Sequence, residues 1–173
     1  MITKIGDIEP LVVAGRRAPA AAFAKLRRLA ASEQWQTREV AATALVEIGK
    51  RQPEAVLAEA AVWASDPDPN VRRAAGEGLR GLAKADPTRV RPVLDGLRAD
   101  PSRYVQKAVA NVLRNASVGH PDFVLAVCAE WAGARHPATS RIVTDGLRRL
   151  ETSRPREVAR ILAACALSSR GHG

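Results

Sequence analysis

The residues of this sequence most suited to chemistry are two glutamates that stand among aromatic or basic side chains, Glu39 and Glu77. Trp35 precedes Glu39 by four residues, a spacing that puts ring and carboxylate on one face of a helix. A carboxylate can stabilise positive charge that develops on a sugar, or orient a water molecule, and an aromatic face can attract a cation or stack on a base. The alternative for this pair is a packing tryptophan beside a surface glutamate.

Glu77 lies in the middle of a row, because Arg73, Glu77 and Arg80 are spaced i, i+4 and i+7 and share one helix face. Rows with the same spacing recur at 34-residue intervals, at Glu39, Thr43 and Val46, at Lys107, Asn111 and Arg114, and at Arg141, Asp145 and Arg148. Arg38 and Arg72 add cations at a neighbouring position. If the rows lie side by side, they form a basic surface that can neutralise phosphates and release counterions. The alternative is a solvated helix face.

The elements that would position these rows also recur every 34 residues. The clearest marks of the period are five prolines, Pro19, Pro53, Pro87, Pro121 and Pro155. Proline is favoured in the first turn of a helix, so each unit is predicted to be a helix A that starts at the proline, a turn, and a helix B. A period of this size is typical of a repeat array, and no segment alternates with period two, so we expect no sheet.

The predicted fold is therefore all-α, an α-solenoid of about four and a half two-helix repeats. Helix A is predicted at 19–31, 53–64, 87–98, 121–132 and from 155 onward. Helix B is predicted at 33–50, with Ser32 as its N-cap, and at 70–83, 101–116 and 137–150. The 173 residues suit one domain, with 1–17 as a loose lead-in containing at most a short helix, 18–168 as the repeat domain and 169–173 as a flexible tail.

Composition narrows the classes of function. Lys and Arg outnumber Asp and Glu by 27 to 18, a formal net charge of +9, which indicates a polyanionic partner or else a merely soluble basic protein. The N-terminal stretch carries Asp7 and Glu9, unlike a signal peptide, and no apolar run is long enough to span a membrane. Cys128 and Cys165 are predicted to be reduced core thiols rather than a disulfide or a catalytic pair. We expect a cytoplasmic, nucleoid-associated protein.

No cofactor or metal site is expected from the sequence. The chain has no glycine-rich phosphate loop, and none of the three histidines has a second ligand at metal-binding spacing. His120 and His136 precede prolines and are predicted to be solvated turn residues.

The motifs of the chain resemble those of a known family. An Asp-Pro turn followed by Val-Arg-x-Ala is similar to HEAT repeats, and the Trp-Leu-Gly-Tyr pattern of tetratricopeptide repeats is absent. From about residue 35 to 150 the chain resembles the HEAT-like alkylpurine DNA glycosylases, the AlkC and AlkD branches. The AlkC branch has Arg-Arg-Ala-x-Ser-Glu-Gly-x-Arg, and residues 72–80 are Arg-Arg-Ala-Ala-Gly-Glu-Gly-Leu-Arg. It continues with Asp-Pro-Ser-x-Tyr-Val-Arg-x-Ser-Val-Ala-Asn-x-Leu-Asn-Asp, and residues 100–115 are similar. The AlkD motifs are matched by Lys107, Ala108, Leu113 and Arg114, and by Trp35 with Glu39.

The resemblance implies a right-handed solenoid that holds damaged, double-stranded DNA on its concave B-helix face. It also implies excision of N3- or N7-alkylated purines by hydrolysis of the N-glycosidic bond, without a deep base pocket. Such bases are cationic leaving groups, so the reaction needs mainly a carboxylate that stabilises oxocarbenium-like charge. Carried over, Glu39 and Glu77 would be the catalytic carboxylates. The DNA-binding residues would be Trp35, Arg38, Arg72, Arg73, Arg80, Tyr104, Lys107, Asn111, Arg114, Arg141 and Arg148.

The chain departs from the family's motifs at four positions. Asn115 replaces the final Asp of the AlkC motif, and Asn111 stands where the AlkD branch has its second Trp. Ala85 ends a stretch where the AlkC branch has Pro-Arg-Leu-Pro-Trp, and Arg141 replaces the Trp of a late AlkC motif. Two other hypotheses therefore stay open, a non-catalytic binder of damaged or branched DNA and a protein-binding HEAT scaffold. The sequence leaves the oligomeric state open.

Overall fold

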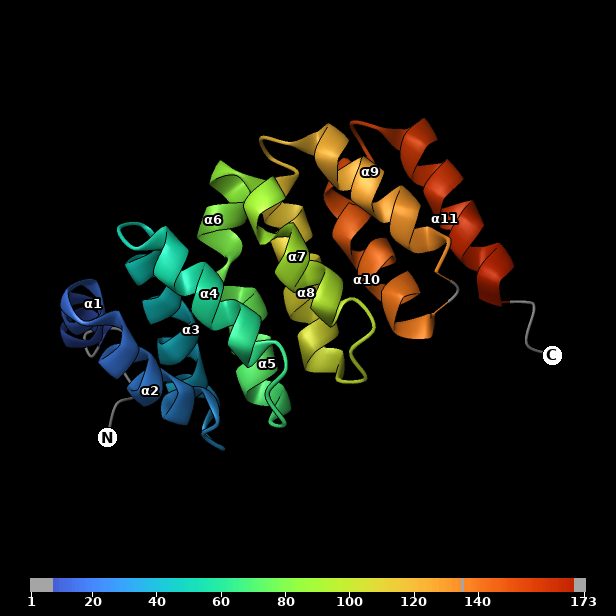
Figure 1. Ribbon diagram of the computed structural model, residues 1–173. Helices are drawn as coiled ribbons and strands as arrows, with labels where there is room; N and C mark the ends of the chain where they lie inside the picture. Colours follow the sequence, from blue (N-terminus) through green and yellow to red (C-terminus); the bar gives the residue numbers. More distant parts are fainter. Residues whose placement is uncertain (1–7, 135, 170–173) are drawn as a thin grey trace.

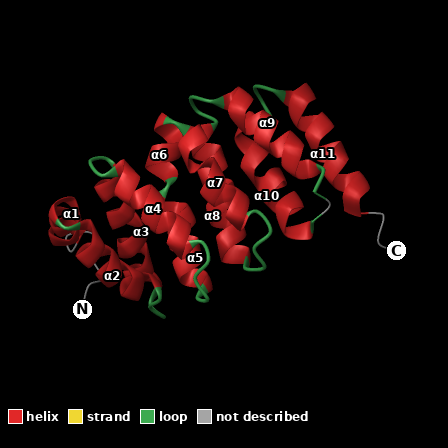
Figure 2. Cartoon of the chain, in the orientation of Figure 1, coloured by secondary structure: helices red, strands yellow, loops and turns green. Residues whose placement is uncertain are grey.

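The structure is a computed structural model that describes residues 8–134 and 136–169. These residues form helices joined by short loops and contain no strand, as Figure 2 shows, so the all-α prediction is confirmed. The elements of Figure 1 are α1 (Ile8–Arg17), α2 (Pro19–Ala30), α3 (Trp35–Gly49), α4 (Pro53–Trp63), α5 (Pro69–Gly78), α6 (Arg80–Ala85), α7 (Pro87–Leu97), α8 (Arg103–Ala116), α9 (Pro121–Ala132), α10 (Pro137–Leu147), a 3-10 turn (Arg148–Leu150) and α11 (Pro155–Ser169).

The helices form a solenoid with two layers. One layer contains the A helices α2, α4, α7, α9 and α11, and the other contains the B helices α3, α5 with α6, α8 and α10 (Figure 1). Each A helix begins at its predicted proline, which confirms both the role of the five prolines and the 34-residue period. The main packing partners are close in sequence: α5 packs on α3 and α8, and α8 packs on α10. The predicted solenoid of two-helix repeats is therefore present.

Apolar columns with the repeat period fill the space between the layers. Leu45, Leu79, Leu113 and Leu147 are at most 2% exposed, and they follow one another at the repeat interval. Two A helices carry buried tryptophans, Trp63 and Trp131, whose indole N–H groups donate to Glu59 Oε1 at 2.6 Å and Asp95 Oδ1 at 2.9 Å. Cys128 and Cys165 are buried thiols and not disulfide-bonded, as predicted.

Several predicted boundaries need correction. Ser32 is not the N-cap of α3, because Gln34 holds that position and the Ser32 hydroxyl instead accepts the backbone N–H of Gln34 at 3.2 Å. The predicted lead-in is a helix from Ile8 onward and is packed rather than loose, since Ile8, Leu11 and Val12 are buried in the core. Residues 1–7 and most of the predicted tail lie outside the described residues.

The B helix predicted at 70–83 is interrupted at Leu79, which separates α5 from α6. Gly76 and Gly78 weaken this part of the helix, because glycine has a low helix propensity. At Gly78, α5 also lies close to α3: a Cβ added there would lie 2.8 Å from the Cβ of Leu45. The last turn of the B helix predicted at 137–150 tightens into the 3-10 turn, as helix ends commonly do.

Candidate nucleic-acid interface

The predicted rows lie side by side on the B helices, and direct contacts join them. Arg73 Nη2 lies 3.4 Å from Glu39 Oε2, and Asn111 Nδ2 donates to Glu77 Oε2 at 3.2 Å. Each pair joins residues at one position of successive repeats, 34 residues apart. We call the surface formed by the rows of Glu39, Arg73, Lys107 and Arg141 the row surface. The alignment predicted from sequence spacing is present in the structure.

Glu77 is the least exposed carboxylate of the row surface, with its side chain 11% exposed. Asn111 donates to Oε2, and Arg80 Nη1 lies 3.3 Å from the same oxygen. No described residue hydrogen-bonds Oε1. Burial raises the pKa of Glu77 above its ordinary value, and the nearby Glu39 adds to this, while Arg80, Arg73 and the Asn111 amide oppose it. The site thus holds a largely buried carboxylate with one oxygen left for a ligand or water.

Asn111 is itself held by two neighbours on α8. Its Oδ1 accepts from Arg114 Nη2 at 3.5 Å and from Asn115 Nδ2 at 3.3 Å. Asn115 Nδ2 also donates to the backbone oxygen of Asn111 at 2.8 Å, and Arg114 Nη1 donates to the backbone oxygen of Asp145 at 2.9 Å. Asn115 was identified from the sequence only as the replacement of a carboxylate, so its contact with Asn111 is new.

The second predicted carboxylate is in a different setting. The Glu39 side chain is 45% exposed and forms an ion pair with Arg73. Trp35 begins α3 and is 64% exposed, so the alternative of a buried packing tryptophan is wrong. Tyr104, near the start of α8, is 66% exposed. Both aromatic side chains are therefore exposed, at the N-terminal ends of B helices, where a ligand can reach them.

The cations of the row surface differ in how far they are neutralised. Arg73, Arg80 and Arg148 form ion pairs with Glu39, Glu77 and Asp145. Arg114 donates to a carbonyl and an amide oxygen, and no carboxylate of the described residues pairs with it. Lys107 and Arg141 are exposed, and neither forms an ion pair or hydrogen bond with a described residue. Uncompensated positive charge is thus concentrated on α8 and α10.

Two predicted DNA-binding arginines donate hydrogen bonds to the backbone of turns. Arg72 donates through Nη1 to the backbone oxygens of Asp66 and Pro67 at 2.9 and 3.0 Å, and through Nε to Asp100 at 2.6 Å. Arg38 Nη1 donates to the backbone oxygens of Ser32 and Glu33 at 2.8 and 2.7 Å.

Gln106 makes the equivalent bond on α8, from Nε2 to the backbone oxygen of Asp100 at 2.9 Å. The sequence contains a signal for this role, because Arg38, Arg72 and Gln106 are themselves 34 residues apart and each follows a turn. Arg38 and Arg72 thus hold turns, and their contact with DNA stays a prediction.

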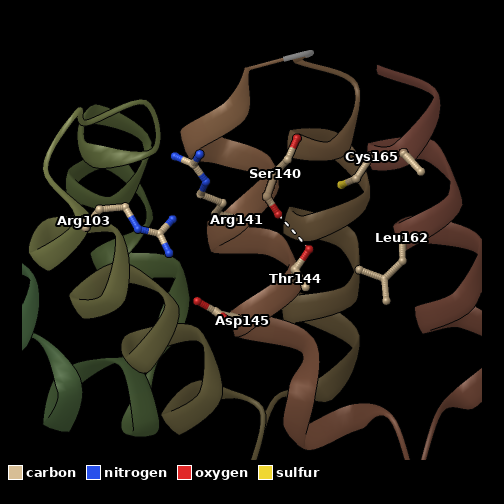
Figure 3. A pocket seen from close by; sticks show the side chains of 8 residues that line it. Arg103, Ser140, Arg141, Thr144, Asp145, Leu162 and Cys165 are labelled. Carbon is tan, nitrogen blue, oxygen red and sulfur yellow. Dashed lines mark hydrogen bonds between the residues drawn. The ribbon is translucent and has the colours of Figure 1, made fainter. Parts of the chain in front are cut away.

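A hollow of about 390 Å³ lies between α8, α10 and α11, beside the row surface (Figure 3). Arg103 and Arg141 line it from α8 and α10, and Leu162 and Cys165 line it from α11. Burial raises the pKa of Cys165, and it raises that of Cys128 to about 12, so neither thiol is a ready nucleophile. The sequence did not single out this hollow.

The described residues contain no cluster of three or more side chains of the kinds that hold a metal ion. None of the described helices combines the length and hydropathy that crossing a lipid bilayer requires.

The solved structures whose fold is similar to that of this chain include proteins of the family that the sequence resembles. No family model matches the chain, and no curated protein does. The alkylpurine DNA glycosylase AlkC of Pseudomonas fluorescens, bound to DNA containing an abasic site analog, superposes with a TM-score of 0.76 at 26% identity, over 90% of this chain and 44% of that chain. AlkD2 from Streptococcus mutans gives 0.70 at 23% identity, over 82% and 70% of the two chains. The protein smu.31 from Streptococcus mutans UA159 gives 0.69 at 23%, over 82% and 73%. The chain spans less than half the length of the AlkC chain, and the resemblance in fold is confirmed.

Proposed function

We propose that this protein binds double-stranded DNA along the row surface and acts in the repair of alkylated DNA. In this proposal it releases N3- or N7-alkylated purines by hydrolysis of the N-glycosidic bond. The observation that carries the proposal is Glu77, a largely buried carboxylate in the middle of a basic surface whose Oε1 bonds no described residue. The similarity to a DNA-bound AlkC supports it.

The reaction asks little of the protein besides a negative charge in the right place. An alkylated purine is cationic and leaves without prior protonation, so the barrier lies in the positive charge that forms on the sugar. A carboxylate shielded from water stabilises that charge more strongly than a solvated one. Glu77 has this shielding, and its free Oε1 can face the sugar or orient the water whose oxygen bonds to the sugar carbon. Arg73 and Arg80 favour its ionised form.

The phosphates of the DNA would contact the uncompensated cations. Lys107 and Arg114 lie on α8, which packs on the helix that carries Glu77, and Arg141 lies on α10, which packs on α8. Each lysine or arginine that meets a phosphate releases counterions, so affinity should fall steeply with salt. Trp35 would contact the cationic base or the neighbouring bases by cation–π attraction or stacking.

The experiment that tests the proposal is base release from methylated DNA. Purified protein is incubated with the DNA, and free 3-methyladenine and 7-methylguanine are counted for wild type, Glu77→Gln and Glu54→Gln. Glu54 is the matched control, because it lies on the A helix α4 in an ion pair with Arg89, in the other layer. Release by wild type and Glu54→Gln but not by Glu77→Gln supports the proposal. Release by all three removes Glu77 from the mechanism.

A second candidate is a DNA binder without catalysis, and Asn115 favours it. An amide replaces the last carboxylate of the AlkC motif, and an amide cannot accept a proton from water. In this case the wild-type protein holds methylated DNA with the same salt dependence but releases neither base above background. Absence of DNA binding at low salt would leave the protein-binding scaffold.

A further inference from the structure

We infer that Asn115 and Arg114 are positioning residues that hold the Asn111 amide in one orientation, with its N–H group toward Glu77, and thereby keep that carboxylate ionised. The inference rests on the proposed function of Glu77 and adds two residues that act on it through a third. It also gives Asn115 a role of its own, besides being the replacement of a carboxylate of the AlkC motif.

The orientation of Asn111 follows from what its neighbours can do. The Arg114 guanidinium only donates hydrogen bonds, and the N–H₂ end of Asn115 only donates. Both point at the same atom, Asn111 Oδ1, at 3.5 and 3.3 Å. The opposite end of that amide, Nδ2, lies 3.2 Å from Glu77 Oε2. A flipped amide would set its N–H₂ group against two donors and its oxygen against a carboxylate, so one orientation is favoured on both sides.

The two positioning side chains are themselves fixed. Asn115 Nδ2 also donates to the backbone oxygen of Asn111 at 2.8 Å, one helical turn back, which fixes which end of its amide faces Asn111. Arg114 Nη1 donates to the backbone oxygen of Asp145 on α10 at 2.9 Å. Hydrogen bonds therefore run from α10 through α8 to the carboxylate on α5, across three repeats.

The orientation of the Asn111 amide decides whether Asn111 attracts or repels the negative charge of Glu77. Burial and the neighbouring Glu39 on α3 favour the protonated carboxyl, whereas Arg73 on α5 and Arg80 on α6 favour the ionised form. The Asn111 N–H group on α8 joins the arginines in stabilising the negative charge. The flipped amide would turn this attraction into a repulsion. A carboxylate at position 115 would accept the Asn111 N–H group, draw it away from Glu77 and add a second negative charge.

The test compares Asn115→Asp with Gln52→Glu, which also replaces an amide by a carboxylate but at the N-cap of the A helix α4, outside the rows. The pKa of Glu77 is measured by NMR titration of ¹³C-labelled carboxylates, and base release is measured against pH. We expect Asn115→Asp to raise the pKa of Glu77 by about one unit and to move the acidic limb of the release profile up by the same amount. Gln52→Glu should leave both unchanged. An unchanged pKa in folded Asn115→Asp overturns the inference.

Two further variants keep the test decisive. Asn115→Ala removes the donor without adding charge and should give a smaller rise in the same direction, and it replaces Asn115→Asp if that variant does not fold. Asn115→Gln restores an amide donor and should bring the pKa back toward the wild-type value. If the wild-type protein releases no base, the proposed function fails, yet the Glu77 titration still shows whether Asn115 acts on that carboxylate.

Discussion

The arginines on α5 and α6 lie against carboxylates, whereas the cations Lys107, Arg114 and Arg141 on α8 and α10 have no carboxylate partner among the described residues. The two halves of the row surface have the same backbone plan, since they are successive repeats of one period. The rows of α5 with α6 and of α8 differ at their central position, which is Glu77 in one repeat and Asn111 in the next, while the α10 row again has a carboxylate there, Asp145, paired with Arg148. Glu77 thus gives the first half a largely buried carboxylate suited to chemistry, and Asn111 leaves the cations of α8 without one and available to a polyanion.

The largest effect is expected when the Glu77 carboxylate of the first half is removed. Glu77→Gln should lower base release by about 10²- to 10³-fold, the range found when one electrostatic group of an active site is removed. The affinity for DNA should stay within about twofold or become tighter, because the variant loses a negative charge beside the phosphates. Release assays at saturating DNA, with binding measured separately, check both statements. A parallel loss of affinity would show that Glu77 holds the fold or the DNA instead.

The two halves can also be compared in how closely their helices pack at glycines. A Cβ added at Gly78 would lie 2.8 Å from Leu45, and one added at Gly146 would lie 2.9 Å from Leu113. Gly78→Ala and Gly146→Ala should each lower the free energy of unfolding by about 1–3 kcal/mol through overpacking. Gly96 meets no atom within 4 Å of such a Cβ, so Gly96→Ala should raise stability by up to about 1 kcal/mol. Urea unfolding of the three variants measures the differences. Unequal losses at Gly78 and Gly146 would show that the halves are packed differently.

Charge removal from the second half should weaken DNA binding without affecting the reaction step. Lys107→Ala and Arg141→Ala should each reduce the slope of log K against log salt by about 0.9, and lower affinity by roughly tenfold or less at physiological salt. Arg73→Ala should reduce the slope less, because its guanidinium lies 3.4 Å from Glu39. Arg89→Ala, on the A-helix layer and paired with Glu54, is the control. Equal slopes for Lys107→Ala and Arg89→Ala would place the DNA on another face.

The smallest effect concerns stability and pH. Burial raises the pKa of Glu77, so this side chain contributes stability below the ordinary glutamate pKa of 4.5 that is lost as pH rises through the higher folded-state pKa. Glu77→Gln escapes that loss and should be more stable than wild type at pH 7, with the difference vanishing near pH 4. Urea midpoints at the two pH values test this. A less stable variant at pH 7 would mean that the pairing of Glu77 with Arg73 and Arg80 outweighs its burial.

The fold was predictable because one period repeats through the chain. The prolines fix where A helices begin, and the i, i+4, i+7 spacing of Arg73, Glu77 and Arg80 places them on one helix face. The break at Leu79 was not predicted, because the i, i+4, i+7 spacing continues across it, although the low helix propensity of Gly76 and Gly78 was visible in the sequence. Similarly, Ser32 has the chemistry of an N-cap, but the turn sets Gln34 in that position.

The site was predictable as a list of positions but not as an arrangement of contacts. Glu39 and Glu77 have the same chemistry in the sequence, and only the packing shows that Glu77 is largely buried while Glu39 stays half-exposed in an ion pair. Arg38 and Arg72 look like further cations of the surface. Their bonds to turn carbonyls depend on the path of the backbone, which the spacing of charged residues does not reveal.

Because the main packing partners belong to the same or adjacent repeats, the array resembles a one-dimensional chain of coupled units, in which local stability depends on having a neighbour on both sides. Amide hydrogens at the two ends then open by local unfolding of a single repeat, while those of α5 and α8 open only when a larger part of the array unfolds. The hydrogen-bonded link between Glu77 and Asn111 joins those two central helices. We therefore expect the slowest-exchanging segment of the array to be the one that holds the candidate carboxylate in place.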